Sequence, residues 1–446
     1  MSEIIRSLST RDRSFQASFA AIRERGSQTN ANADTAAREI VSAVRERGDK
    51  ALLEYTRKFD GVDLSVADLK ISADDLRAAV TKVPAEAIKA LRLAARRIRD
   101  FHAKQRSRSW SYLDGSGLRL GQQITPLRRV GVYVPGGHAA YPSSVLMTVI
   151  PARVAGVEEV IMVSPAGKGG FNPAVLAAAS IAGVDQVFRI GGAQAVAALA
   201  YGTATVPQVD KIVGPGNAYV QAAKKLVYGV ADIDKMAGPS EVLVIADDSA
   251  DPTFVAADLL AQAEHGSGDE CAVMLSPSRR LIARVEREIA AQLEQLPRRE
   301  AIAGVLRQRG ALIHVRNLDE AVEIAEQVAP EHLELMIRQP QKLAPKIRNS
   351  GAIFLGSHAP APLGDYLAGP NHVLPTGGTA RFFSPLGVYD FVKRTSIVEA
   401  SPAGLRRLGP SVAELARLEG YEAHAVAVEK RYFTQSPASR KRTKKS

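Results

Sequence analysis

The sequence predicts an α/β protein built on parallel β-sheets that are covered by helices on both faces. From Arg128 onward, short β-branched runs alternate with Ala-rich stretches that end in glycine, which is the pattern of strand–helix–strand units. The runs are apolar throughout instead of alternately apolar and polar, as expected for strands buried on both sides. A chain of 446 residues is also too long for one ordinary core, so we expect more than one domain.

Helices are expected before the first strand. Residues 39–60 and 75–105 carry apolar side chains at spacings of three and four, which is the period of an amphipathic helix. The expected strands then follow at 130–134, 159–164, 186–190, 211–213, 241–246, 271–276, 311–315 and 352–356.

An internal similarity indicates two related α/β units. VIMVSP at 160–165 and AVMLSP at 272–277 are each an apolar run that ends in Ser-Pro and precedes a helical stretch. After about Thr376 the alternation stops. Two short helices are expected beyond it, at 411–419 and 422–431.

The formal net charge of +11 is unevenly distributed. Basic residues gather in the tail at 436–446 and in a helical run at 92–108. Such runs are usually solvated surfaces, and the tail has no aromatic residue that could stack on bases. We therefore expect no nucleic-acid partner, and at most a modest attraction for anionic cofactors.

The compartment is expected to be the cytoplasm. A single cysteine, Cys271, excludes an intramolecular disulfide and fits a reducing environment. The N-terminal residues lack the apolar stretch of a secretory signal, and no apolar run approaches the roughly 20 residues of a membrane span. The composition, 46% hydrophobic and 24% charged, is that of a globular protein.

Three glycine-rich segments follow expected strands, where ligands bind in open α/β sheets. They are YVPGG at 133–137, GGAQA at 191–195 and GPGNAYV at 214–220. Each could bring backbone N–H groups close to an anion. A complete GxGxxG is absent, so a dinucleotide site and simple tight turns both remain open.

A helix is expected from Pro252, capped by Asp251, to about His265. Gln262 and His265 lie three residues apart, so their side chains share a face. This pair is either half of a metal site or a polar helix end that faces water.

Three further histidines lie beside acidic residues. Glu331 directly precedes His332, Asp365 lies upstream of His372, and Glu419 upstream of His424. Each taken alone fits an ordinary core or surface histidine. The other four, which have no polar cluster around them in the sequence, are His102, His138, His314 and His358.

Together these segments resemble the histidinol dehydrogenase family from about residue 30 to 431. The resemblance rests on the motifs RRVGVYVPGG, VDKIVGPGNAYV, AGPSEVLVIAD, LLAQAEHG, PEHLEL, GDYLAGPNHVLPTGGTARF and EGYEAHAVAVEKR. It implies oxidation of L-histidinol to L-histidine, the last steps of histidine biosynthesis, in two NAD-dependent steps through a bound aldehyde. The alternative is a paralogue that uses zinc and NAD to oxidise another polar alcohol, such as a sulfonated diol.

The resemblance also implies a fold of two incomplete Rossmann-like parallel-sheet units, a helical N-terminal segment and a small helical C-terminal domain exchanged within a homodimer. The domains expected on this basis are an N-terminal helical arm at 1–30, the helical part of the first α/β domain at 31–127, a Rossmann-like NAD-binding domain at 128–238, a second Rossmann-like domain with the zinc site at 239–380, the exchanged domain at 381–435, and a disordered basic tail at 436–446.

Functional residues carry over from the family by motif. The ligands of one zinc ion per subunit would be Gln262, His265, Asp365 and His424, with His424 supplied by the partner subunit. These four would also bind the substrate, in active sites shared by the dimer, together with Ser240, His332, His372 and Glu419. The NAD contacts would be Tyr133, Gln194 and Asn217. The acid–base pair would be Glu331 and His332.

The chemistry suits these residue types. Histidinol offers an amine and an imidazole, so zinc would orient it by chelation, and mixed nitrogen and oxygen ligands leave positions open for exchange. His332, with a pKa near neutrality, would take the hydroxyl proton, and Glu331 would activate water for the second step. The rival mechanism needs a cysteine nucleophile. Only Cys271 could serve, and we expect it to be buried and structural.

Overall fold

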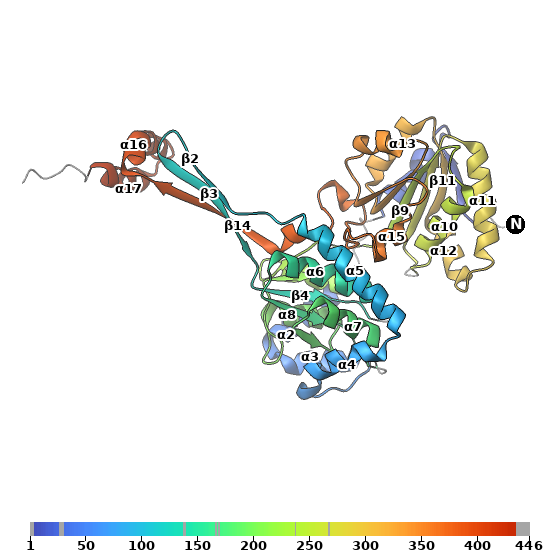
Figure 1. Ribbon diagram of the computed structural model, residues 1–446, viewed down its shortest axis with the longest axis horizontal. Helices are drawn as coiled ribbons and strands as arrows, with labels where there is room; N and C mark the ends of the chain where they lie inside the picture. The colour runs from blue at the N-terminus through green and yellow to red at the C-terminus, as the bar shows by residue number, and fades with distance from the viewer. Residues whose placement is uncertain are drawn as a thin grey trace, which may run out of the picture. The chain divides into compact units, whose positions relative to one another are not determined.

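The computed structural model describes residues 4–25, 31–136, 140–165, 167, 170–236, 238–265 and 268–433. The chain divides into two compact units. Unit 1 consists of residues 1–106 and 127–391, and unit 2 of residues 107–126 and 392–446. Unit 1 contains two parallel sheets with helices around them (Figure 1), which confirms the predicted α/β class.

The first sheet has five parallel strands in the order β6-β5-β4-β7-β8. Its strands are β4 (Arg129–Tyr133), β5 (Glu159–Val163), β6 (Gln186–Phe188), β7 (Lys211–Val213) and β8 (Asp232–Ile233). Because β4, β5 and β7 are apolar and almost wholly buried, both faces of the sheet need a cover of helices.

Helices cover this sheet on both sides. One face packs on α2 (Ala31–Arg47), α3 (Asp49–Asp60), α8 (Gly192–Tyr201) and α9 (Ala218–Val227). The other packs on α4 (Ala73–Ala78), α5 (Ala85–Ala103), α6 (Pro142–Ala155) and α7 (Pro173–Ala182). Side-chain caps fix where two of these helices begin: Asn172 accepts a backbone hydrogen bond at the start of α7, and Asn217 accepts two at the start of α9.

The second sheet has six parallel strands in the order β1-β11-β10-β9-β12-β13. They are β1 (Arg6–Ser9), β9 (Glu241–Ala246), β10 (Cys271–Ser276), β11 (Gly310–His314), β12 (His332–Met336) and β13 (Ala352–Leu355). One face packs on α10 (Pro252–Ala263), α11 (Arg279–Leu293) and α12 (Arg299–Arg309). The other packs on α1 (Phe15–Arg23), α13 (Leu318–Val328) and α14 (Pro340–Leu343). Figure 1 shows α10, α11 and α12 on the side of this sheet opposite to α13.

Unit 2 is a three-stranded antiparallel sheet with two helices. Its strands, in the order β14-β3-β2, are β2 (Trp110–Leu113), β3 (Leu118–Pro126) and β14 (Val392–Ala400). In Figure 1, β3 and β14 form a long ribbon with α16 (Pro402–Leu418) and α17 (Glu422–Phe433) at one end. That end is held by contacts of α16 with the β2–β3 turn, where Arg407 Nη1 donates to the carbonyl of Gly115 at 3.0 Å.

The structure differs from the expected domain limits in several places. The N-terminal segment is not only helical, because β1 pairs with β11 at the edge of the second sheet. The region at 31–127 ends in β2 and β3, which belong to unit 2, and unit 2 resumes at Val392 instead of 381. The first of the two C-terminal helices starts at Pro402, nine residues before the expected 411. The expected tail at 436–446 lies outside the described residues.

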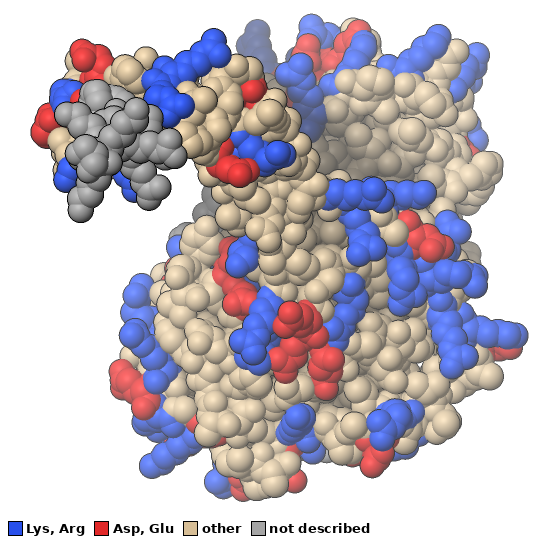
Figure 2. All heavy atoms as spheres, turned by 60° about the vertical axis from the view of Figure 1, so that its left-hand side comes forward, with Lys and Arg blue, Asp and Glu red and all other residues tan. Residues whose placement is uncertain are grey.

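The basic run at 92–108 forms the second half of α5 and the residues after it. On the face of the molecule in Figure 2, Lys and Arg side chains are interspersed with Asp and Glu. None of the helices in the described part of the chain combines the length and the apolar character that crossing a membrane requires.

Candidate active site

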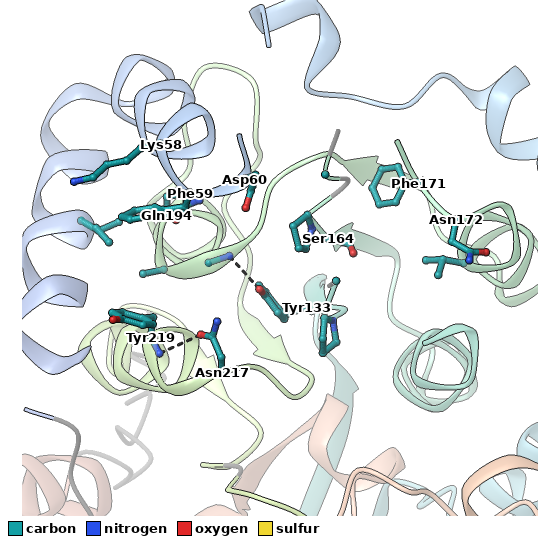
Figure 3. Close-up of a pocket in the computed structure, with 18 of the residues that line it drawn as sticks. Lys58, Phe59, Asp60, Tyr133, Ser164, Phe171, Asn172, Gln194, Asn217 and Tyr219 are labelled. Atoms are coloured by element: carbon teal, nitrogen blue, oxygen red, sulfur yellow. Dashed lines mark hydrogen bonds between the residues drawn. The ribbon is translucent and has the colours of Figure 1, made fainter. Parts of the chain in front are cut away.

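A cavity of about 900 Å³ opens at the carboxyl edge of the first sheet. Its walls include Tyr133 at the end of β4, Ser164 after β5, Gln194 at the start of α8 and Asn217 before α9. Figure 3 shows these side chains around the opening. This is the edge at which open α/β sheets bind ligands, and all three residues expected to contact NAD line it.

The three expected NAD residues are held in different ways. The hydroxyl of Tyr133 accepts a hydrogen bond from the backbone N–H of Gly192 at 3.0 Å, and burial raises the pKa of Tyr133 to about 12. The side-chain oxygen of Asn217 accepts from the N–H groups of Tyr219 and Val220, each at 3.1 Å. Gln194 is fully buried, and neither atom of its amide has a hydrogen-bond partner. An unpaired buried amide is costly, and this one belongs to a side chain that lines the cavity.

The glycine-rich turn before Asn217 approaches the neighbouring strand closely. Gly214 has a φ of +112°, and a Cβ at this position would lie 2.1 Å from the carbonyl oxygen of Tyr133. The turn is held by a buried ion pair of Lys224 and Asp234. Lys224 Nζ also donates to the carbonyl of Gly214 at 3.0 Å, and Asp234 accepts from the N–H of Gly214 at 2.8 Å.

Nothing in the sequence indicated that the end of α3 borders this cavity. Lys58, Phe59 and Asp60 line it too, with Phe59 next to Gln194 (Figure 3). Burial raises the pKa of Asp60 to about 6, and its Oδ2 is buried without a hydrogen-bond partner. No motif marks these residues, since only the packing of α3 against α8 brings them here.

A second polar cluster lies at the amino edge of the second sheet. Glu331 and His332 are located at the start of β12, which pairs with β9 next to Ser240. The carboxyl end of α10 reaches the same edge because this helix runs antiparallel to the strand before it. The cluster therefore lies at the edge opposite to the one that ligands of open α/β sheets usually occupy.

His332 is at the centre of this cluster. Its Nδ1 donates to the carbonyl of Glu241 at 3.0 Å, and its Nε2 lies 3.4 Å from Asp365 Oδ1. Glu331 Oε2 lies 3.6 Å from His332 Nδ1 and accepts from the N–H of Glu241 at 2.9 Å. With Nδ1 bonded to a carbonyl, Nε2 is the ring nitrogen directed at the Asp365 carboxylate.

The turn before this pair is strained. Ala329 ends α13 with a φ of +47°, and it is the only non-glycine residue with a positive φ in the described ranges. Left-handed alanine costs about 1 kcal/mol. The turn brings the chain directly from α13 into β12, whose first residue is His332.

The charges of the cluster shift its pKa values. Burial alone would lower the pKa of His332, but the negative charges of Glu331 and Asp365 outweigh it and raise this pKa to about 9. Burial raises the pKa of Glu331 to about 8. Burial also acts to raise the pKa of Asp365, yet the hydrogen bond and the charge of His332 keep it below the usual range. The pKa of His332 therefore lies above the near-neutral value expected from the sequence, because two carboxylates surround the ring.

His372 joins the cluster to α6. Its Nδ1 donates to the carbonyl of Asp365 at 2.9 Å, and its Nε2 lies 3.2 Å from Ser144 Oγ. Burial lowers the pKa of His372. Ser144 was not expected from the sequence. It lies near the start of α6, and the segment before this helix contributes Pro135, Gly136 and Ala140 to the cavity of the first sheet.

Gln262 and His265 lie where α10 ends. Gln262 is 4% exposed, and its Nε2 is buried with no hydrogen-bond partner. His265 lies in the turn after the helix, with its Nδ1 3.2 Å from the carbonyl of Gln262. The charge of His265 contributes to lowering the pKa of Asp365. His265 and Asp365 therefore lie in the same part of the structure. Across the residues described, no group of three or more His, Cys, Asp or Glu side chains could hold a metal ion.

The remaining expected site residues, Glu419 and His424, belong to unit 2. Glu419 is the C-cap of α16, and His424 lies in the first turn of α17. Both are exposed. The ring of His424 lies 5.1 Å from that of Tyr421.

Two of the residues that were expected to be ordinary, His102 and Cys271, are buried. His102 is buried and its Nδ1 bonds to the carbonyl of Ile98, and His138 lies outside the described residues. Cys271 is buried, its Sγ lies 3.4 Å from the carbonyl of Arg309, and burial raises its pKa to about 11. A thiol with this pKa is a poor nucleophile at neutral pH.

A model of the histidinol dehydrogenase family matches residues 23–432. The chain belongs to the histidinol dehydrogenase family. It is 54% identical over 431 residues to the histidinol dehydrogenase of Nitrosospira multiformis, a match that covers 96% of this chain and 97% of that protein. It is 53% identical over 427 residues to that of Geobacter sulfurreducens, covering 95% and 99%. The crystal structure of histidinol dehydrogenase from Elizabethkingia anophelis superposes with a TM-score of 0.91 at 34% identity, covering 97% of this chain and 98% of that one.

These comparisons confirm the resemblance found in the sequence and the α/β class with parallel sheets. The exchange of the C-terminal domain within a homodimer stays a prediction. The relatives that carry the name histidinol dehydrogenase match along nearly their whole length. The alternative, a paralogue that oxidises another polar alcohol, is therefore not favoured.

Proposed function

We propose that this member of the histidinol dehydrogenase family oxidises L-histidinol to L-histidine, using NAD in two steps with L-histidinaldehyde as the bound intermediate. The observation that carries the proposal is the cluster around His332. It gathers a buried histidine, a buried glutamate and Asp365 at one edge of the second sheet, within reach of α6 and the segment that borders the cavity. Family membership supplies the substrate class.

The cavity of the first sheet suits NAD. It is large enough for much of a dinucleotide, it lies at the carboxyl edge of a parallel sheet, and Gln194 offers an unpaired buried amide. Tyr133 and Asn217 would hold the cofactor together with Gln194. When bound, NAD supplies the acceptor for the hydride of each oxidation.

The end of α10 suits one zinc ion per subunit. Gln262 has a buried amide atom without a partner, and a ligand position would explain why such a group is retained. With His265 and Asp365 it offers mixed nitrogen and oxygen donors, and His424 of a second copy would complete the set. The metal supplies a positive centre to which the amine and imidazole of the substrate can bind.

The protein's own residues account for the proton transfers. Each oxidation releases a proton from an oxygen of the substrate. His332 Nε2 would accept it once the ring has lost its own proton, because Nδ1 is bonded to the carbonyl of Glu241. Glu331 is placed beside this ring to take a proton from the water that adds to the aldehyde. His372 and Ser144 would orient the substrate at the side of α6, and Ser240 and Glu419 would contribute further contacts.

Unit 2 supports a homodimer with shared active sites. Its strands and helices expose large apolar side chains, among them Trp110, Tyr112, Leu113, Val398, Leu415, Leu418 and Tyr421. Apolar surface of this kind is typical of an interface, and a second copy of the chain would cover it. Within such a dimer Glu419 and His424 would reach the partner's cluster. We place the enzyme in the cytoplasm, where the buried Cys271 stays reduced.

The proposal is tested by incubating the purified protein with limiting L-histidinol and excess NAD. We expect two NADH per histidinol, L-histidine as the product, and loss of turnover with a chelator that zinc reverses. One NADH per histidinol with accumulation of the aldehyde, or no turnover at all, would contradict the proposal.

A further inference from the structure

Arg25, which follows α1, is the only cation that the structure pairs with the Glu241 carboxylate among the described residues. The side chains of Arg25 and Glu241 are 5% and 3% exposed. The Nε of Arg25 donates to Glu241 Oε2. Its other two nitrogens donate to the carbonyls of Ile22 and Val328, each at 2.9 Å. Each of the three guanidinium nitrogens therefore donates a hydrogen bond, and together these bonds hold the group in one orientation.

Glu241 in turn contacts both members of the acid–base pair through its backbone. Its N–H donates to Glu331 Oε2 at 2.9 Å, and its carbonyl accepts from His332 Nδ1 at 3.0 Å. Its own carboxylate also accepts from the N–H of Gly377 at 2.8 Å. A shift of Glu241 would therefore move the water-activating carboxylate and change which nitrogen of His332 carries a proton.

We propose that Arg25 is a positioning residue for the acid–base pair: by neutralising the buried Glu241 carboxylate, it holds the backbone of Glu241 in place, and this backbone fixes Glu331 and the tautomer of His332. The inference rests on the proposed function of the pair. A carboxylate buried without a cation is strongly destabilised. Without Arg25, the Glu241 carboxylate would move toward water, and its backbone contacts would change with it.

The N-terminal segment, β1 and α1, positions the side chain of Arg25. Strand β1 pairs with β11, and Phe15, Phe19 and Ile22 of α1 are buried in the core under the second sheet. Arg25 follows directly. The segment thus reaches from one edge of the sheet to Glu241 at the start of β9.

The test compares Arg25→Met, Arg25→Lys and Arg25→Met/Glu241→Gln in the full-length enzyme. Arg23→Met is the matched control, because Arg23 ends the same helix but is exposed and pairs with the neighbouring Glu24. We expect Arg25→Met to lower kcat per folded subunit by roughly 10- to 100-fold, since small misplacements of catalytic groups have effects of this size. NAD affinity should stay within about twofold, because the cavity is lined by other residues.

The double variant separates positioning from a merely structural role. Glu241→Gln removes the unpaired charge and can still accept from Gly377, so it should restore a large part of the kcat lost in Arg25→Met. A ¹⁵N spectrum of the His332 ring, assigned by comparison with His332→Asn, should show the Nδ1 proton shifted in Arg25→Met and restored in the double variant. Arg23→Met should match the wild type in both measurements.

Wild-type kcat in Arg25→Met, or no restoration by Glu241→Gln, would overturn the inference. Should Arg25→Met fail to fold, Arg25→Lys decides: lysine keeps the charge but cannot donate in the same three directions, so wild-type kcat in this variant would also overturn it. If the wild type does not oxidise histidinol, the proposed function fails instead. The ¹⁵N spectra then still test whether Arg25 controls the His332 ring.

Discussion

The buried ion pair behind the cofactor cavity allows a quantitative prediction. Lys224 and Asp234 have side chains 0% and 1% exposed. Replacing Lys224 with methionine keeps most of the side-chain volume but leaves the Asp234 carboxylate without this cation. Breaking a buried pair in this way costs about 3–5 kcal/mol. We expect a loss of unfolding free energy near the lower end of this range, because the N–H groups of Gly214 and Lys235 still donate to Asp234.

The same variant should weaken NAD binding. Lys224 holds the carbonyl of Gly214, and the turn that begins there ends at Asn217 on the cavity wall. Unfolding in urea and NAD titration by calorimetry measure the two effects. Lys225→Met is the control, because Lys225 is next to Lys224 in the chain but its side chain is exposed. Its replacement should change the free energy of unfolding by no more than about 0.5 kcal/mol.

A double variant tests the reasoning. Lys224→Met/Asp234→Asn removes both charges, so it should be more stable than Lys224→Met alone. A loss below about 1 kcal/mol in Lys224→Met would refute the claim that an uncompensated buried charge is created. So would a double variant less stable than either single one.

Three further predictions concern the chemistry. Raising the pH from 7 toward 9 should raise kcat/KM, by up to about tenfold per unit, because the raised pKa of His332 keeps a proton on the ring at neutral pH. His332→Asn should remove the part of this dependence that belongs to the ring, leaving that of Glu331, while zinc content stays normal. A flat wild-type profile or loss of zinc would contradict the assignment. Cys271→Ala should complete both oxidations, since burial raises the pKa of this thiol to about 11; a stall at one NADH per histidinol would favour a covalent mechanism. Truncation before Gly420 should abolish zinc binding and activity together, whereas a chain that ends at Phe433 should keep both; full zinc content without residues 420–433 would exclude His424 as a ligand.

Family motifs predicted three residues of the cavity in the first sheet. The shape of this cavity, in contrast, depends on how the helices pack against the sheet. Tyr133 lies at the end of an apolar run, and Gln194 and Asn217 each follow one; these runs predict buried strands, and parallel strands bring their carboxyl ends to one edge. Asp60 lies on the same cavity without any local signal. It ends an amphipathic helix of ordinary composition, and only the packing of that helix against the sheet gives the residue its position.

The pattern of apolar runs determined which strands could be found from the sequence. β9 and β10 are wholly apolar or nearly so, and both were expected. β12 was not expected from the sequence, because His332 and Glu334 interrupt its apolar run. The strand is nevertheless buried throughout. β1 and β14 were missed for the opposite reason: they are edge or surface strands with polar, exposed residues, whose partners lie far away in the chain.

The sequence by itself determined the α/β class and, through long motifs, the family and its candidate residues. Local composition suffices for this because burial selects apolar residues with the period of each element. Only the tertiary structure decided that the His332 cluster lies at the amino edge of its sheet. It also decided that Glu241, paired with Arg25, contacts Glu331 and His332 through its backbone. Contacts between residues some two hundred positions apart leave no periodic trace in the chain, since they depend on how β1, α1 and β9 pack together.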